Sequence, residues 1–451
     1  MKNLLFFSIF HLIVFNQILS QELTRDNFTE QIYEMFHDAG LNWESITAFN
    51  PRSFDPDFNV DINLDSKNKS NGQLNLNVYN QNLLLGGYGY LTFKDHYYCY
   101  LSQRIPVQEK EEINLHPKNP NLHKQYFSGL GYQNNWVRIQ IARGRESWGS
   151  GNSIHLGLKN SSEPYDYFLL GSDYGIVRVR YIHGFLENIG ENINRYITAR
   201  GIELTNKKSL VIGFSETVIY SGENRSLDIG YFNPISSHTE IEMNDRLNNI
   251  GGSNSNAIWQ LHVDHLLKKN LRFSFNYLID EFVLDPDIEK NKENGTGFSI
   301  RLAYTPIFKN NKQLTFYSSF IQVGTPTFRH NNGANNFVQN GRPLGWEMGS
   351  DGREIEFGIN FLYKHNLKIS TEVGISQIGE ETINERVFDP YKDYLKGSFP
   401  SGENYFFHFA TISIHHLYME KYSIFSNLSI LDKTNYFELI ISASLGSFIK
   451  K

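Results

Sequence analysis

The chain has 451 residues, a formal net charge of −6, 26 Tyr and 34 Phe, and a mean hydropathy of −0.42. A mildly acidic balance gives no support to nucleic acid as a partner. The single cysteine, Cys99, excludes an internal disulfide framework, and its setting in "YYCY" indicates an apolar, membrane-facing or core-facing position.

The N-terminus is typical of a secretory signal peptide. Lys2 precedes an apolar run, LLFFSIFHLIVF, which is too short to cross a bilayer as a helix, and cleavage is expected after Ser20. We therefore expect residues 1–20 to be removed on export. After them, no stretch approaches the ~20 apolar residues that a transmembrane helix requires.

Residues 21–70 are expected to form a helical or irregular periplasmic segment. Apolar residues recur at helical spacing at Phe28, Ile32, Met35 and Phe36. Thr24 or Asp26 would cap this helix, and Gly40 would end it. Two interpretations remain open: a short packing helix, or a plug that docks in the periplasmic mouth of the domain that follows.

From residue 71 to residue 451, apolar and polar residues alternate with a period of two, as in β-strands. Clear examples are Leu74–Val78, Val137–Ile141, Val177–Tyr181, Phe298–Tyr304 and Ile355–Phe361. One face of each strand is apolar. The opposite faces suit a wet lumen far better than hydrocarbon. The charged residues expected in this lumen are Arg138, Arg178, Arg180, Asp264, Arg301 and Glu356.

Short and long connections alternate in the C-terminal half. Short turns are expected near 206–208, 268–270, 309–312, 364–366 and 420–421, and longer links near 221–256, 284–296, 324–352 and 379–403. This asymmetry predicts an all-β fold, a transmembrane antiparallel outer-membrane β-barrel of roughly 16–18 strands with periplasmic turns and extracellular loops. A soluble β-sandwich or β-helix is the main alternative.

The stretch "RGRESWGSG", residues 143–151, joins two predicted strands. Its glycines lack the Lys-Ser/Thr of a phosphate loop and the strand-to-helix setting of a dinucleotide site. We instead expect Arg143, Arg145 and Glu146 to pair inside the barrel, with Trp148 near an edge. The glycines would allow a bulge or a close approach between strands. The following residues, 152–158, alternate as a strand does.

This stretch also carries a resemblance. Its R-G-R-x-x-W-G-x-G pattern consists of Arg143, Gly144, Arg145, Trp148, Gly149 and Gly151, and "LDIGYFNPISSH", with Asn233 and Pro234, follows further along. Together with the signal peptide, helical N-terminus and many strands, these motifs resemble the Wzi capsule-assembly family of outer-membrane proteins. Ser150 departs from the Pro that often occupies this place in the motif, and the chain ends "LGSFIKK" without a terminal aromatic residue.

The resemblance implies a barrel of about 18 strands with a helical bundle on its periplasmic side. It implies a lectin-like protein of the outer membrane that holds capsular or related surface polysaccharide and makes or breaks no bond. The expected partners are that polysaccharide, outer-membrane lipid and the capsule export machinery, and the expected state is a monomer. No sugar-contacting residue is carried over from the family.

Glycan contacts are expected in the long link that spans residues 324–354, which is rich in Asn, Gly, Arg and aromatic residues. Trp346 would stack on a sugar face, whereas Arg342, Asn340 and Glu347 would bond hydroxyls or pair with acidic sugars. Trp148 is a further candidate for glycan contact. The alternative is an ordinary solvated loop.

No catalytic or metal site is expected. His262 and Asp264 share one strand face, but a metal needs three or four converging ligands and a hydrolase needs a positioned nucleophile. We therefore expect neither enzymatic activity nor a cofactor, and an outer-membrane hydrolase is the least favoured function. The stronger alternative to polysaccharide binding is a porin-type diffusion channel for small solutes. The two differ in whether the lumen is open.

Overall fold

The computed structural model describes residues 34–44, 46–49, 70–79, 82–94, 96–108, 126–134, 136–151, 153–190, 192–244, 246–247, 255–281, 291–309, 312–364, 366–391, 396–418, 422–431 and 434–446. The predicted signal peptide and the first part of the predicted N-terminal helix, with Thr24 and Asp26, lie outside the described residues. Of the segment 21–70, the structure describes 34–44, 46–49 and Ser70, which begins the first strand.

Eighteen strands form one antiparallel sheet. They are β1 (Ser70–Tyr79), β2 (Asn82–Phe93), β3 (Tyr97–Gln108), β4 (Phe127–Gln133), β5 (Val137–Gly144), β6 (Tyr165–Asp173), β7 (Val177–Ile189), β8 (Ile193–Thr205), β9 (Leu210–Glu223), β10 (Ser255–Lys268), β11 (Leu271–Glu281), β12 (Gly295–Lys309), β13 (Lys312–Val323), β16 (Gly352–Tyr363), β17 (Leu367–Ile378), β18 (Tyr405–Tyr418), β19 (Tyr422–Leu431) and β20 (Thr434–Gly446). A separate small hairpin joins β14 (Val338–Gln339) to β15 (Arg342–Pro343).

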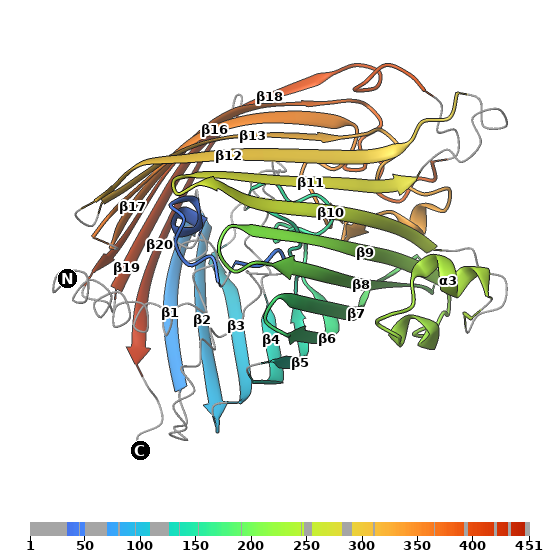
Figure 1. Cartoon of the computed structure of the whole chain (residues 1–451), viewed down its shortest axis with the longest axis horizontal. Helices are drawn as coiled ribbons and strands as arrows, with labels where there is room; N and C mark the ends of the chain where they lie inside the picture. The colour runs from blue at the N-terminus through green and yellow to red at the C-terminus, as the bar shows by residue number, and fades with distance from the viewer. Residues whose placement is uncertain are drawn as a thin grey trace.

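The large sheet closes on itself (Figure 1). Each of its strands pairs with the next one along the chain, and β20 pairs back with β1, with Leu76 opposite Ile441. Closure leaves no unpaired sheet edge. This matters because unpaired backbone groups at an edge are not tolerated in hydrocarbon. The eighteen strands confirm the predicted barrel.

The two ends of the barrel differ. At the short-turn end, tight turns join β8 to β9, β10 to β11, β12 to β13, β16 to β17 and β18 to β19, at the five places predicted from the sequence. At the long-loop end, longer links separate β3 from β4, β5 from β6, β9 from β10, β11 from β12, β13 from β16 and β17 from β18, whereas β1 and β2, β7 and β8, and β19 and β20 follow each other closely there.

Side chains alternate between the two faces of the wall. On β16, Ile355, Phe357 and Ile359 point outward and are 42–53% exposed, whereas Glu354 and Glu356 point inward and are buried. Repeated around the barrel, this pattern makes the outward apolar belt that lipid requires. Cys99 is exposed on β3, in register with Leu91 and Leu130.

A short helical turn at residues 34–38 lies inside the barrel at the short-turn end. The backbone N–H of Leu41 donates to the carbonyl of Phe36 (2.8 Å), and Gly40, at φ +77°, ends the helix as predicted. Gln313 of β13 donates to the carbonyl of Met35. This placement fits the plug interpretation. No helix among the described residues is long and apolar enough to cross a membrane.

Candidate functional site

Charged groups hold the helical turn at residues 34–38, which we call the plug helix, at the short-turn end of the barrel. Asp38 is fully buried and accepts two hydrogen bonds of 2.8 Å from Arg301 of β12. Arg272 of β11 donates to Asp38 (3.2 Å) and makes a bidentate pair with Asp264 (2.7 and 2.6 Å). Because removing one partner would leave buried charge uncompensated, this network fixes the helix in place.

The chain beyond the helix is fixed by a second pair. Arg178 of β7 donates to Glu203 of β8 (2.8 Å) and to the carbonyl of Glu44 (2.8 Å). The other Glu203 oxygen accepts the N–H of Ala48 (2.7 Å) and the hydroxyl of Thr47 (3.0 Å). The segment therefore runs along the inner wall toward the middle of the barrel.

There it meets "RGRESWGSG", which folds into the lumen. Phe49 forms a β-bridge with Trp148, and their rings lie 5.1 Å apart. The Trp148 indole N–H donates to Glu146 (2.8 Å), and Glu146 pairs with Arg180 (3.2 Å). Glu146 therefore forms an ion pair inside the barrel, as predicted, but its partner is Arg180 of β7 and not Arg143 or Arg145 of the motif.

The motif crosses to the opposite wall. Gln260 of β10 donates to the carbonyl of Trp148 (3.2 Å), and Asn276 of β11 exchanges hydrogen bonds with the backbone of Ser150 (2.8 and 2.9 Å). Gly149 has φ +140°, and a Cβ there would lie 2.8 Å from the Asn276 oxygen. A side chain at this position would therefore oppose the crossing through both backbone strain and contact.

Several expectations for this region need correction. Of the predicted strand 152–158, the structure describes residues 153–158, which form no strand in the barrel wall because they lie within the inserted loop. Arg143 points outward from β5 and pairs with Asp166 (2.9 Å), since Ala142 and Gly144 take the inward positions. Arg145 donates to the carbonyl of Ser162 (2.9 Å) and lies over the Phe127 ring.

The other predicted lumen residues lie on inward faces. Arg138 donates to Tyr98 (3.3 Å) and to Gln140 (2.5 Å), within a hydrogen-bonded group on the β3 and β5 wall. Glu356 is buried on β16, in register with Ser319 of β13.

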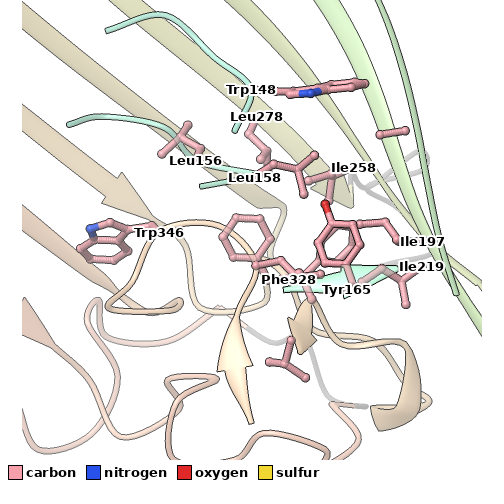
Figure 2. Packing of buried hydrophobic residues seen from close by; sticks show 14 of the residues in the cluster. Trp148, Leu156, Leu158, Tyr165, Ile197, Ile219, Ile258, Leu278, Phe328 and Trp346 are labelled. Carbon is pink, nitrogen blue, oxygen red and sulfur yellow. The ribbon is translucent and has the colours of Figure 1, made fainter. Parts of the chain in front are cut away.

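An apolar layer fills the middle of the lumen (Figure 2). The inserted loop contributes Trp148, Leu156 and Leu158, and the 324–351 loop contributes Phe328 and Trp346. They pack against wall residues Ile197, Ile219, Ile258 and Leu278, which come from β8, β9, β10 and β11. The two loops also bond directly, because the N–H of Trp346 donates to the carbonyl of Leu156 (2.9 Å).

Three of the predicted glycan contacts are buried in or beside this layer. Trp346 is 0% exposed and Trp148 is 1% exposed, so neither indole presents a face on which a sugar could stack. Glu347 is largely buried and pairs with Lys159 of the inserted loop. These three residues tie loops together, because both loops fold inward instead of projecting outward.

The remaining candidates lie at the surface of the long-loop end. Asn340 is exposed at the tip of the β14–β15 hairpin with φ +46°, and its backbone N–H donates to Glu187 (3.1 Å). Arg342 is half-buried and lies 3.5 Å from Glu163.

A second polar group lies on the neighbouring 379–404 loop. Glu381 pairs with Arg386 (2.7 Å) and with Arg329 (2.8 Å), and Arg386 also pairs with Asp389 (3.1 Å). Tyr391 covers the Arg329 guanidinium at 4.5 Å. Burial raises the pKa of Tyr391 to about 12, so its hydroxyl stays protonated and able to donate at neutral pH.

Three residues that order these loops were not singled out from the sequence. Arg195 of β8 is fully buried and donates to the carbonyls of Ala334 and Asn336 (2.6 Å each). Asn336 in turn donates to two carbonyls of the 379–404 loop (3.1 Å each). Asp351 accepts from Thr325 (2.8 Å) and from the Ser401 N–H (2.9 Å). One indication of Arg195 was present in the sequence: it alternates in phase with the inward-facing residues of its strand, such as Ile197 and Ala199.

His262 and Asp264, which share one face of β10, have different contacts. His262 is buried beside the Phe49 ring (5.5 Å), and Asp264 is engaged by Arg272. Within the described residues, no group of three or more His, Cys, Asp or Glu side chains is arranged to hold a metal ion.

A closed sheet of eighteen antiparallel strands with an outward apolar belt and an interior lined by charged groups defines an outer-membrane β-barrel. Among solved structures, it is similar to Wzi of Escherichia coli, an outer-membrane carbohydrate-binding β-barrel involved in group 1 capsule assembly. The TM-score is 0.60 at 11% identity, over 83% of this chain and 84% of Wzi.

Two Pseudomonas aeruginosa proteins are also similar. The outer-membrane protein OprD has a TM-score of 0.49 at 11% identity, over 84% of this chain and 96% of its own. OccK3 has a TM-score of 0.47 at 7% identity, over 85% and 96% of the two chains. No family model matches this sequence, and no curated protein matches it. At these identities the likeness establishes the fold alone.

Proposed function

We propose that this protein is a non-enzymatic outer-membrane binding protein that holds capsular or related surface polysaccharide at its long-loop end. The single observation that carries the proposal is the apolar layer of Trp148, Leu156, Phe328 and Trp346 across the lumen. A diffusion channel needs a continuous wet path, and this layer opposes one. The fold similarity to the carbohydrate-binding barrel Wzi supports the same function.

The proposed contact surface is the outer face of the 324–351 loop together with the neighbouring 379–404 loop. It combines the exposed amide of Asn340 with the cations of Arg342 and Arg386. Guanidinium groups bond carboxylates in bidentate fashion, and amides and tyrosine hydroxyls bond sugar hydroxyls. Such a surface suits a polymer that presents hydroxyls and carboxylates. A rigid loop foundation limits the entropy lost on binding.

A retention assay tests the proposal. A deletion strain should keep producing its surface polysaccharide but release it into the medium, and the full-length gene should restore retention. The double variant Asn340→Ala with Arg342→Ala should restore it poorly, whereas Trp136→Ala, an exposed residue at the short-turn end, should behave as wild type. Polymer that stays cell-bound in the deletion strain would contradict the proposal.

The molecular partners follow from the same proposal. We propose a monomer in lipid, since the closed sheet leaves no strand edge that would need a partner chain. The short-turn end, facing the periplasm, is the side from which capsule export machinery would deliver polymer. Crosslinking from this end in intact cells, followed by identification of the captured proteins, tests that arrangement.

A further inference from the structure

One long loop folds over the outside of the barrel instead of into it. We call residues 224–244 and 246–247, which follow β9, the outer lobe. It contains η2 (Ile229–Phe232) and α3 (His238–Met243) and lies beside the ends of β7, β8 and β9 (Figure 1). The alternation of each strand shows which face it covers. Ile219 of β9 belongs to the interior apolar layer, so Glu216, Val218 and Tyr220 point outward.

These outward residues are nevertheless buried. Tyr231 of the lobe stacks on Tyr220 at 4.9 Å, and the His238 N–H donates to Glu216 (3.0 and 3.1 Å). The Tyr181 hydroxyl of β7 donates to the carbonyl of Tyr231 (2.8 Å). Val218, Tyr220, Tyr231 and Ile241 form an apolar cluster of their own on the outer wall.

The lobe also covers charge. Arg200 of β8 and Glu216 of β9 both point outward and pair at 3.2 Å, with about 10% and 4% of their side chains exposed. Trp259 of β10 donates to Glu216 (2.9 Å), and Arg200 donates to the carbonyl of Asn233 (3.3 Å). Without the lobe, this ion pair would stand on the membrane-facing side of the wall.

Strand lengths place this covered patch within the membrane. Between the turn at 206–209 and Arg200, β8 exposes only Ile202 and Leu204 on its outer face. At ~3.3 Å per residue, that bare stretch spans roughly 13 Å along a tilted strand. A barrel needs an apolar band ~25 Å tall. On β16, by contrast, outward residues from Ile355 to Tyr363 are apolar at every position.

The lobe surface completes the missing part of the band. It presents five exposed apolar side chains: Leu227 (43%), Ile229 (71%), Phe232 (44%), Ile235 (89%) and Met243 (79%). An exposed ion pair between Glu240 and Arg246 (2.5 Å) marks a polar edge. The lobe that carries these apolar side chains covers the outward, membrane-facing side of the wall, in keeping with acyl chains as the occupant. A second copy of the chain is the outcome to be distinguished.

We propose that the outer lobe lies in the outer half of the bilayer and contacts the acyl chains of the outer leaflet through Ile229, Phe232, Ile235 and Met243. It replaces lipid over β7 to β10 and so allows a buried Arg–Glu pair on the outer wall at membrane depth. The lobe is thus a lipid-binding surface, independent of any polysaccharide bound at the loop end.

Spin labels on full-length protein in phosphatidylcholine vesicles test this placement. In a Cys99→Ser background, Ile235→Cys and Met243→Cys are labelled, with Ile355→Cys as the belt control and Asn340→Cys as the water control. The labels at 235 and 243 should match the label at 355, with collision rates severalfold higher for oxygen than for a water-soluble nickel chelate. Values matching the label at 340 would overturn the proposal.

A second measurement separates lipid from a second copy. Vesicles with one protein each, and vesicles with several, should give the same collision rates and no spin–spin broadening at position 235. Broadening that grows with protein density, together with loss of oxygen access, would show that another chain covers the lobe and would overturn lipid contact. Cysteine substitutions at exposed positions leave the buried network intact, so folding is preserved.

Discussion

Trp346 shows how strongly burial decides what a side chain can do. Its loop, rich in Asn, Gly and Arg, has a composition that suits both an external sugar-binding loop and a folded plug. The choice depends on contacts between segments far apart in the chain, such as the hydrogen bond from Trp346 N–H to Leu156. No local pattern reveals such a contact, and for that reason the glycan prediction for Trp346 failed.

Trp346→Ala should therefore affect stability before it affects binding. Removing a fully buried indole leaves a cavity, and such changes cost ~3–5 kcal/mol. Thermal unfolding of the purified barrel, followed by its heat-modifiable migration on gels, measures the loss. Trp136→Ala is the matched control, because Trp136 is 54% exposed. Equal stability of the two variants would contradict the packing described for the lumen.

His37 gives the plug a pH dependence. Burial lowers the pKa of His37 to about 3, with the nearby Arg272 adding to the effect. A released helix would bind a proton below about pH 6.5 that the docked helix does not bind. Docking therefore weakens as pH falls from 6.5 toward 3, by roughly 2 kcal/mol at pH 5.

Thiol labelling measures this effect. Ala39→Cys in a Cys99→Ser background reports on plug release, and its labelling rate is normalised to that of a free thiol at each pH. The excess labelling at pH 5 over pH 7 should shrink when His37→Gln is added. Because Asp38 is present in both proteins, its own titration cancels from the comparison. An unchanged pH profile would refute the role of His37.

At the level of elements, strand periodicity was sufficient to predict which side chains of the barrel wall point inward and which point outward. A period of two places Arg178, Arg180 and Arg301 inward and Ile355 and Phe357 outward with no further information. Turn lengths separated the two ends of the barrel. Arg143 was misplaced because it stands where β5 reaches the rim, and there an outward arginine pairs with Asp166 away from the apolar belt.

The links were less predictable than the strands. The inserted loop and the 324–351 loop turn inward, whereas the outer lobe folds over the outer wall, and all three are polar and glycine-containing. What separates them is the partner surface, which lies on strands distant in sequence. The alternation in "NSIHLGL" arises because Ile154, Leu156 and Leu158 of the inserted loop pack into the apolar layer, and it does not mark a strand of the barrel sheet.

The plug helix should depend on Asp38. Asp38→Asn removes one of the carboxylates that compensate Arg272 and Arg301, whose side chains are only 2–3% exposed, and leaves Glu34 and Asp264 in place. Breaking a buried pair from one side costs ~3–5 kcal/mol, enough to release the helix while the barrel stays closed. Protease cleavage within residues 34–44, with a barrel that still migrates as folded, is the expected result.

Asp166→Asn serves as the comparison for that experiment. Its ion pair with Arg143 is exposed, with 62% of the Asp166 side chain accessible. Exposed pairs contribute little to stability, so cleavage of the plug segment should match wild type. Similar cleavage of both variants would show that the plug is not held by the Asp38 network.

On the scale of the whole molecule, the barrel is occupied from both ends. The N-terminal segment enters from the short-turn end and reaches Trp148 through Phe49, and two loops enter from the long-loop end. The closed wall satisfies backbone groups in lipid, and inside it the two loops pack an apolar layer against β8 to β11. Sequence periodicity predicted the wall, but the filled lumen emerged only from the folded chain.

The filled lumen is also the feature that separates a polysaccharide-binding barrel from a diffusion channel, and planar-bilayer recording tests it most directly. Purified full-length protein should insert without producing steady conductance, whereas Trp148→Ala, which loosens the packed layer, should show intermittent current. Steady, solute-selective conductance of the wild-type protein would contradict the account and favour a channel.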